Sequence, residues 1–492
     1  MGDPDTGSPS LGRAAASGAG ITLVSQGLRF VLQIIALVVL SRLLTPSDFG
    51  LVAMVTAILG VAEIIRDFGL SSAAIQAKEL SDGERTNLFW ANLGIGTACA
   101  AVAAACSPLI AAIYSRPELT GVTLALSWLF VVSGANTQFR AELSRSLRFR
   151  ALAVTDVGAQ ALGIGAGILS AVLGFGFWSI VIQQIVFVVA TCAINVVSCR
   201  WRPGWPHRGI SLRRFFKFGA GLLGMQVMGY ATNNVDTVAL GSVWGAGPVG
   251  LYSRGYQLLM VPLSQVSNAL LRVVLPVLSR VQDDDETYLR YVRRAQLLCC
   301  YGFGLSFAVA AGLSGPLVAV LFGAAWSGVA PIFALLAIGG IFRGLAQTTY
   351  WITLSKGLTG SQLRFYLLAR PFMIISILAG LPWGAVGVAA GHSFAFMVEW
   401  AASLWWMGRS AGIDYRPLLR RALRSVLLVC VPAGLIALAG SMLPVPAVLR
   451  LVLGALAAAG YVVGLAVVSS TERADLRLMA DFVQRATGRG RP

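Results

Sequence analysis

Long apolar runs constrain this chain more than any other feature of its sequence. Of the 492 residues, 57% are hydrophobic and only 12% are charged, which leaves too little polar surface for a soluble protein of this length. A run of about 20 apolar residues spans a bilayer as a helix. The sequence therefore predicts an all-α polytopic membrane protein with about 14 transmembrane helices, near residues 21–40, 49–66, 88–112, 119–139, 151–173, 177–198, 214–241, 250–276, 295–321, 329–354, 362–380, 384–407, 421–441 and 446–469.

Basic residues are distributed unequally between the two sides of this predicted bilayer. Six of the 38 lysines and arginines fall inside apolar runs, and 29 of the other 32 lie in one alternate set of connections and tails. Connections rich in Lys and Arg stay in the cytoplasm. We therefore expect both termini to be cytoplasmic, and we attribute the net charge of +17 to topology and not to nucleic-acid binding.

The ends of the chain lie outside the predicted spans. Residues 1–20 are rich in Gly, Ser, Ala and Pro, so we expect a disordered cytoplasmic tail. In the cytoplasmic tail 470–492, Leu476, Met479 and Val483 have a spacing that suits a short amphipathic helix on the membrane lipids of the inner leaflet. Residues 283–294 open with acids and close with bases, an order that suits a cytoplasmic helix before the ninth span.

Residue types that hold metals or nucleotides are scarce. The seven cysteines lie mostly in apolar runs and form no C-x-x-C pair, and the two histidines are His207 and His392. The sequence has no G-x-x-x-x-G-K-[ST] motif. We therefore expect no metal site, no cofactor and no ATP binding through a P-loop.

An internal repeat divides the predicted helices into two lobes. Gly50-Leu51 recurs 200 residues later as Gly250-Leu251, and Pro108–Tyr114 resembles Pro316–Phe322 at an offset of 208. Six helices separate the copies, so both have the same orientation, as in transporters that bind substrate between two rocking lobes. A duplicated scaffold without transport is the alternative. The expected organisation is a six-helix lobe at 21–198, a cytoplasmic linker at 199–213, a second six-helix lobe at 214–407 and two extra helices at 408–469.

Arginines inside the predicted spans are the candidate binding residues. An arginine at mid-bilayer costs roughly 2.5–3.5 kcal/mol on insertion scales, and its planar guanidinium is always charged and suits phosphate. A hydrated cationic cavity for an anionic substrate is one interpretation, and internal ion pairs or side chains that reach the interface are the alternative. Arg66, beside Glu63 and Asp67, suits an ion pair equally well, and Arg272 and Arg370 suit the interface. The residues that we expect to line a cavity are Arg29, Arg66, Arg254 and Arg343.

Three acidic residues also lie within predicted spans. Asp236 follows Asn233-Asn234 in the seventh span, and Glu63 and Glu399 lie in the second and twelfth. Such an acid can carry a coupling proton or sodium ion, or it can be the ion-pair partner of an arginine. We retain both interpretations for all three residues.

Several sequence blocks occur in the order found in one transporter family. Across residues 20–470 the chain resembles the Wzx-type polysaccharide flippases of the multidrug/oligosaccharidyl-lipid/polysaccharide exporter superfamily. The blocks that carry this resemblance are Ser41–Gly50 (SRLLTPSDFG), Asp67–Leu70 (DFGL) with Ala74–Gln76 (AIQ), Asn234–Asp236 (NVD), Gly250–Ser253 (GLYS), Pro276–Ser279 (PVLS) and Leu321–Trp326 (LFGAAW).

The resemblance implies a function and a setting. The implied activity is transfer of an undecaprenyl-diphosphate-linked oligosaccharide from the inner to the outer leaflet of the bacterial inner membrane, for lipopolysaccharide, capsule or exopolysaccharide synthesis. It also implies two lobes around a cationic cavity, with Arg29 and Arg66 in helices where related flippases place substrate-facing arginines. Polysaccharide polymerases and glycosyltransferases are the implied protein partners.

Two other classes of function remain open at this point. An ion-coupled small-molecule or drug antiporter of the same superfamily would favour acids over arginines in its cavity. A membrane enzyme is disfavoured because the outer connections are short and no nucleophile, base or metal cluster is evident. A membrane scaffold whose lobes close over a dry seam is the structural alternative.

Overall fold

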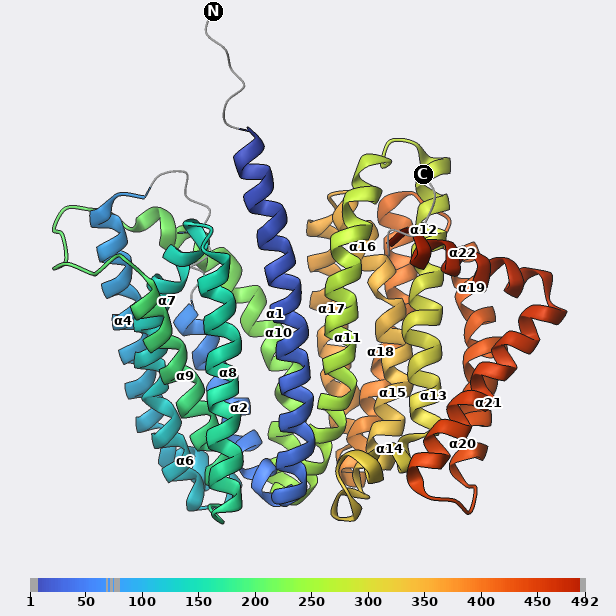
Figure 1. Cartoon of the computed structure of the whole chain (residues 1–492), viewed down its shortest axis with the longest axis horizontal. Coiled ribbons are helices and arrows are strands. Elements are labelled where there is room, and N and C mark those ends of the chain that lie inside the picture. The colour runs from blue at the N-terminus through green and yellow to red at the C-terminus, as the bar shows by residue number, and fades with distance from the viewer. Residues whose placement is uncertain (1–7, 68–69, 71–73, 75–79, 487–492) are drawn as a thin grey trace, which may run out of the picture. The chain divides into compact units, whose positions relative to one another are not determined.

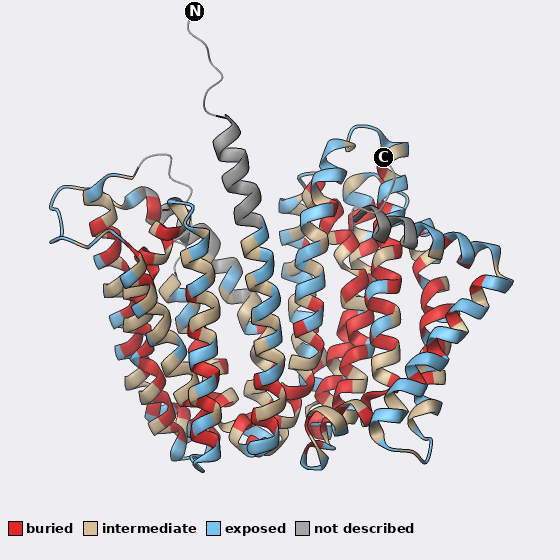
Figure 2. Cartoon of the chain, viewed as in Figure 1, coloured by how far each residue is buried: buried red, intermediate tan, exposed pale blue. Residues whose placement is uncertain are grey.

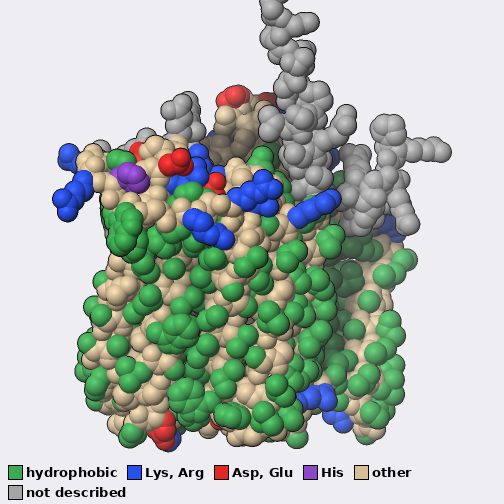
Figure 3. Space-filling model, turned by 60° about the vertical axis from the view of Figure 1, so that its left-hand side comes forward, with side chains coloured by type: hydrophobic (Ala, Val, Ile, Leu, Met, Phe, Trp, Pro, Cys, Tyr) green, Lys and Arg blue, Asp and Glu red, His purple; other side chains and the backbone are tan. Residues whose placement is uncertain are grey.

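The computed structural model describes residues 8–67, 70, 74 and 80–486, and this part of the chain consists of helices and connections without a strand (Figure 1). Three predicted features lie partly outside it: residues 1–7 of the N-terminal tail, positions 68–69, 71–73 and 75–79 around the DFGL and AIQ blocks, and residues 487–492 of the C-terminal tail. Hydrophobic side chains form a broad band on the face shown in Figure 3, and basic side chains gather beyond its edge. The predicted all-α polytopic membrane fold is confirmed.

Twelve segments of the described chain are long and apolar enough to cross a membrane. One of them, Thr359–Ala411, contains two separate long helices, and Arg213–Trp244 is not among the twelve. The predicted count of fourteen is therefore not confirmed and stays a prediction.

The chain divides into two compact units, residues 1–250 and 251–492. Several spans of the first unit are built from two helices, because the chain bends at Cys106 before Pro108 and again at Trp128. A capping box of Ser81 and Glu84 begins the third span. The helices of the first unit are α1 (Ser8–Leu43), α2 (Pro46–Asp67), α4 (Asp82–Ala105), α5 (Ser107–Tyr114), α6 (Glu118–Ser127), α7 (Leu129–Arg145), α8 (Phe149–Val172), α9 (Trp178–Ser198) and α10 (Arg213–Trp244).

The second unit begins within α11, a helix of 35 residues that contains Pro262 and Pro276. Short π-helical turns at 300–305 and 426–430 continue two of its spans, and buried residues concentrate in its central helices (Figure 2). Its helices are α11 (Ala246–Arg280), α12 (Asp285–Cys299), α13 (Ser306–Gly312), α14 (Ser314–Leu321), α15 (Val329–Leu345), α16 (Gln347–Ser355), α17 (Thr359–Ala379), α18 (Gly384–Ala411), α19 (Arg416–Ser425), α20 (Val431–Ser441), α21 (Ala447–Val468) and α22 (Ser470–Ala486).

Two predicted boundaries differ from the structure. Residues 8–20, expected to be disordered, belong to α1, since helix-forming residues such as Leu11 and Ala14–Ala16 are interspersed among the glycines and serines. The first unit extends to residue 250 and not to the linker 199–213, because α10 packs against α2. Tyr230 of α10 donates a hydrogen bond from its hydroxyl to the carbonyl oxygen of Thr56, at 2.9 Å.

Two other predicted helices are confirmed. The acid-to-base segment before the ninth span is α12, whose N-cap residue Asp284 accepts a hydrogen bond from the backbone amide of Thr287. The amphipathic segment in the C-terminal tail is α22. Its first turns are held by protein side chains, since Glu472 and Asp475 are both buried.

The repeat is visible where α2 and α11 begin. A Cβ atom added to Gly50 would lie 1.8 Å from the carbonyl oxygen of Ala246, and one added to Gly250 would lie 1.8 Å from the carbonyl oxygen of Pro46. Pro46 and Ala246 are themselves 200 positions apart, as are the two glycines. The first turns of the two helices therefore approach each other reciprocally.

Candidate functional sites in the membrane-spanning helices

The first site is a cluster of two arginines and one aspartate in the first unit. Arg29 of α1 places Nη1 3.3 Å from Oδ2 of Asp156, and Arg140 of α7 places Nη1 2.7 Å from Oδ1 of the same carboxylate. Asp156 lies on α8, which packs directly against α1. The structure thus brings one predicted binding residue together with two charged residues that were not predicted as site residues.

Neighbouring amides and hydroxyls hold this cluster in place. Arg29 donates from Nε to Oε1 of Gln160, and Gln160 donates back to the carbonyl oxygen of Arg29. One residue before Asp156, the hydroxyl of Thr155 donates to the buried amide of Asn195, which donates in turn to Asn136. Three spans are therefore tied together by polar contacts beside the charged cluster.

The electrostatic balance of the cluster is positive. Two guanidinium groups share a single carboxylate, and the side chains of Arg29 and Arg140 are 42% and 43% exposed, against 21% for Asp156. An arginine has five N–H donors, and Arg29 uses two of its nitrogens on Asp156 and Gln160. The remaining donors of both arginines have no hydrogen-bond partner among the described residues, and the planar guanidinium suits phosphate oxygens.

Sequence analysis missed two of these three residues. Arg140 directly follows the predicted span 119–139, in a connection that the sequence predicts to be cytoplasmic, yet it lies within α7 and pairs with a membrane-spanning helix. Asp156 lies in the predicted span 151–173 and is a fourth acidic residue within the predicted spans, beside Glu63, Asp236 and Glu399. The sequence signal that points to Asp156 is an acidic residue within an apolar run.

Arg66 lies in an internal ion pair at the end of α2. Its Nη2 lies 3.6 Å from Oε1 of Glu63, which precedes it by three residues. The guanidinium is largely buried whereas the carboxylate is largely exposed, so their contact is screened by solvent. The pairing that the sequence suggested is present, and a substrate role for Arg66 stays a prediction.

Arg343 lies among aromatic side chains in the second unit. Its guanidinium carbon is 4.8 Å from the ring centroid of Phe396, and its Nη1 lies 3.3 Å from the hydroxyl of Tyr256. His392 packs against both Tyr256 and Phe396, and its Nδ1 is 3.0 Å from the hydroxyl of Tyr252. A cation over an aromatic face keeps its charge while its hydration shell is partly replaced.

Two further residues that the sequence predicts as site residues, Arg254 and Asp236, are buried. Arg254 is 8% exposed and donates from Nη1 to Oε1 of Gln257, one turn later on α11. Asp236 is 1% exposed, and its Oδ1 accepts hydrogen bonds from the backbone amide and the hydroxyl of Thr237. Their predicted roles in substrate binding and ion coupling stay predictions.

Arg370 and Glu399 form a loose pair beside a polar cavity in the second unit. The guanidinium of Arg370 lies over the ring of Tyr366, and its Nη2 is 3.9 Å from Oε1 of Glu399. The other oxygen, Oε2, is buried and has no hydrogen-bond donor among the described residues. Arg370, expected to reach the interface, is therefore bound inside the unit.

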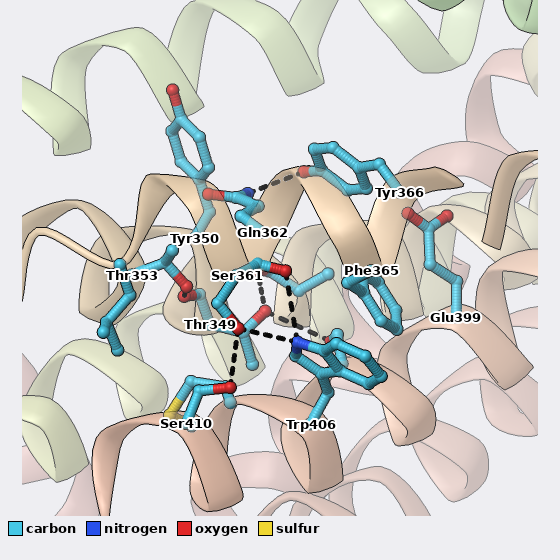
Figure 4. Close-up of a pocket in the computed structure, with 14 residues that line it drawn as sticks. Thr349, Tyr350, Thr353, Ser361, Gln362, Phe365, Tyr366, Glu399, Trp406 and Ser410 are labelled. Atoms are coloured by element: carbon cyan, nitrogen blue, oxygen red, sulfur yellow. Dashed lines mark hydrogen bonds between the residues drawn. The ribbon is translucent and has the colours of Figure 1, made fainter. Parts of the chain in front are cut away.

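Spans ten to twelve supply the walls of this cavity, which encloses about 50 Å³ (Figure 4). Trp406 donates from its indole nitrogen to the hydroxyl of Ser361, and Ser361 is within 2.7 Å of Ser410. Gln362 donates to the hydroxyl of Tyr366 at 2.9 Å. A space of this size, lined in part by hydroxyl and amide groups, has room for a few water molecules next to a carboxylate.

No group of three or more His, Cys, Asp or Glu side chains within the described ranges is arranged to hold a metal ion. What the described sites can do chemically is bind anions at Arg29 and Arg140 and hold water beside Glu399. Neither arrangement contains an activated nucleophile.

Comparisons with known proteins assign the chain to a family. A model of the family described as polysaccharide biosynthesis protein matches residues 39–331, which is more than half of the chain. The lipopolysaccharide biosynthesis protein WzxC of Escherichia coli (strain K12) is 27% identical over 419 residues, covering 83% of this chain and 84% of that protein. The succinoglycan biosynthesis transport protein ExoT of Rhizobium meliloti (strain 1021) is 25% identical and covers 96% of both chains.

Solved structures share the fold. The lipid II flippase MurJ in an inward closed conformation matches with a TM-score of 0.70 and 13% identity, over 89% of this chain and 97% of that one. An inward-facing multidrug resistance MATE family transporter of the MOP superfamily matches with a TM-score of 0.62 and 14% identity, over 78% and 94%. The chain therefore shares a fold with MurJ and with this MATE transporter, and it belongs to the family of polysaccharide biosynthesis proteins.

Proposed function

We propose that this protein is a flippase that moves an undecaprenyl-diphosphate-linked oligosaccharide from the inner to the outer leaflet for envelope polysaccharide synthesis. The observation that carries the proposal is the cluster of Arg29, Arg140 and Asp156, which leaves a net positive charge and unused N–H donors on membrane-spanning helices. The relatives named for lipopolysaccharide and succinoglycan synthesis support the class of substrate.

The mechanism that we propose is alternating access between two like-oriented lobes. The diphosphate is the part of the substrate that the membrane interior rejects most strongly, because an unpaired charge in hydrocarbon is costly. Arg29 and Arg140 would replace part of its hydration, and we extend this role to Arg66, Arg254 and Arg343. The glycan would be carried in water and the lipid tail would remain in the bilayer.

Ion coupling at Glu399 is the second part of the proposal. Its Oε2 lacks a donor within the described part of the chain, and a cavity lined in part by hydroxyl and amide groups lies beside it. A carboxylate with one bound and one unbound oxygen can exchange its partner Arg370 for a coupling ion during transport. Asp236 and Glu63 are the other candidates for this role.

We further propose that both termini are cytoplasmic, and that the protein acts with polysaccharide polymerases and glycosyltransferases and has no catalytic activity of its own. The positive-inside distribution supports the topology. An ion-coupled antiporter of small molecules is the alternative function, and it is less favoured because an excess of arginine over acid in the spans suits anions better than cations.

A transport assay tests the proposal directly. Proteoliposomes that contain the purified chain should move a fluorescent lipid-diphosphate oligosaccharide between leaflets faster than empty liposomes do. The Arg29→Gln variant should lose most of this activity, whereas Arg450→Gln, at the start of α21, should retain it. Equal rates with and without protein would refute the flippase, and protein-dependent export of drugs instead would favour the antiporter.

A further inference from the structure

We propose that a cavity between the ends of α11 and α12 and the C-terminal helix α22 binds one acyl chain of an anionic phospholipid, with Arg294 at the phosphate. The site is separate from the arginine cluster of the first unit and does not depend on the transport function. All of its walls lie within the second unit, where α12 and α22 pack together (Figure 1).

The walls of the cavity are apolar and in part open. It encloses about 240 Å³, and Val273 and Val277 of α11 form one side, Leu298 of α12 a second, and Leu478 and Met479 of α22 the third. Val273 is 50% exposed and Leu478 is 39% exposed. Water inside an apolar cavity of this size would be unfavourable, so an acyl chain that fills the space would be stabilised.

The third wall is held rigidly by a buried ion pair. Glu472 and Asp475 are each 3% exposed. Arg424 donates to Oε1 of Glu472 at 2.7 Å, and the hydroxyl of Tyr301 donates to Oε2 at 2.6 Å. Residues 472, 475 and 479 follow the spacing of one helix face, so the same face that carries these anchors presents Met479 to the cavity.

A single basic side chain lines the cavity. The guanidinium carbon of Arg294 lies 5.8 Å from the ring centroid of Tyr291, and both residues belong to the lining. Arg294 forms no salt bridge with any residue that the structure describes, whereas Arg290, one turn earlier, pairs with Glu286 at 3.2 Å. Within the described ranges, no carboxylate therefore neutralises the charge of Arg294.

The occupant follows from this combination. An apolar slot that ends at an uncompensated guanidinium matches a lipid tail that ends at an anionic headgroup. Because only one arginine lines the cavity, one phosphate balances the charge, and this favours a phospholipid over a polyprenyl diphosphate. A lipid at this position would bridge α11, α12 and α22.

Native mass spectrometry of the full chain in detergent tests the proposal. Phosphatidylglycerol and phosphatidylcholine with identical acyl chains are added separately, and we expect the anionic lipid to bind more tightly. Arg294→Gln should weaken phosphatidylglycerol binding roughly fivefold and leave phosphatidylcholine unchanged. Val277→Trp should fill the cavity and abolish the binding of both lipids, and Leu478→Gln on the opposite wall is a second test should the tryptophan variant not fold.

Matched controls separate this site from general lipid adhesion. Arg290→Gln on the same helix and Val467→Trp on the exposed face of α21 should bind like the unmodified protein. Unchanged phosphatidylglycerol binding in Arg294→Gln, or in both cavity variants, would overturn the proposal. Binding of a polyprenyl diphosphate that these variants abolish, with phosphatidylglycerol unaffected, would overturn it too, because the cavity would then hold the transported lipid.

Discussion

Gly50 and Gly250 lie 200 residues apart in the sequence, and each faces a backbone carbonyl oxygen near the other. Gly50 faces the oxygen of Ala246, four positions before Gly250, and Gly250 faces the oxygen of Pro46, four positions before Gly50. Neither position has room for a methyl group, because the added Cβ would lie 1.8 Å from oxygen. The crossing of α2 and α11 is therefore set by the absence of side chains at two equivalent positions.

The first prediction concerns this crossing. Gly50→Ala and Gly250→Ala should each destabilise the protein by about 1–3 kcal/mol through overpacking. The double variant should lose less free energy of unfolding than the sum of the two single variants, because both sites lie in the same helix crossing. Thermal unfolding in detergent measures the effect. Gly94→Ala is the control, since α4 has open space there, and equal stability of all variants would contradict the close crossing.

The second prediction concerns the charge balance at Asp156. Asp156→Asn removes the carboxylate shared by Arg29 and Arg140, so the two guanidinium groups should repel each other and the melting temperature should fall. A short-chain isoprenyl diphosphate should raise it again, by more than in the unmodified protein. A thermal-shift titration compares the two, and a variant that gains nothing from the diphosphate would remove these arginines from the substrate site.

The third prediction concerns coupling at Glu399. Glu399→Gln should retain binding of the lipid-diphosphate oligosaccharide but lose the dependence of its transport on an imposed ion gradient, because the amide cannot exchange Arg370 for a cation. Flipping in proteoliposomes with and without the gradient measures this. Glu286→Gln, in the exposed ion pair with Arg290 on α12, is the matched control. Gradient-driven transport that survives in Glu399→Gln would transfer the role to Asp236.

The fourth prediction concerns pH and the C-terminal helix. Burial raises the pKa of Asp475 above its usual value near 3.8. The folded protein therefore holds this proton at pH values where the unfolded chain has released it, so the contribution of Asp475 to stability is present at low pH and is lost as pH rises through the raised pKa.

Asp475→Asn should remove this loss. Its melting temperature should equal that of the unmodified protein at acidic pH and exceed it at neutral pH. Differential scanning fluorimetry between these limits measures the difference, and Asp283→Asn, in the exposed connection before α12, is the control. A melting temperature lower than that of the unmodified protein at neutral pH would instead show that the ionised carboxylate stabilises α22 through Arg424.

The sequence by itself determined the fold class, the membrane setting and the family. Apolar runs of about 20 residues admit few structures other than spanning helices, because each helix satisfies its own backbone hydrogen bonds in lipid. The same local information located α12 and α22 by their charge order and apolar spacing. The duplicated positions of Gly50 and Gly250 were also readable, since a repeat is a property of the sequence alone.

Only the tertiary structure decided which charged residues meet. The sequence predicts a cytoplasmic connection directly after residue 139, where Arg140 lies. The partner that places Arg140 beside Arg29 is Asp156 on another helix, 16 positions along the chain from Arg140 and 127 from Arg29. Arg370 was expected at the interface and instead binds Glu399. The energy of a charge in the membrane depends on its nearest opposite charge and on water, and distances between helices set both. Helix periodicity gives the face on which a residue lies, but not the neighbour that it meets.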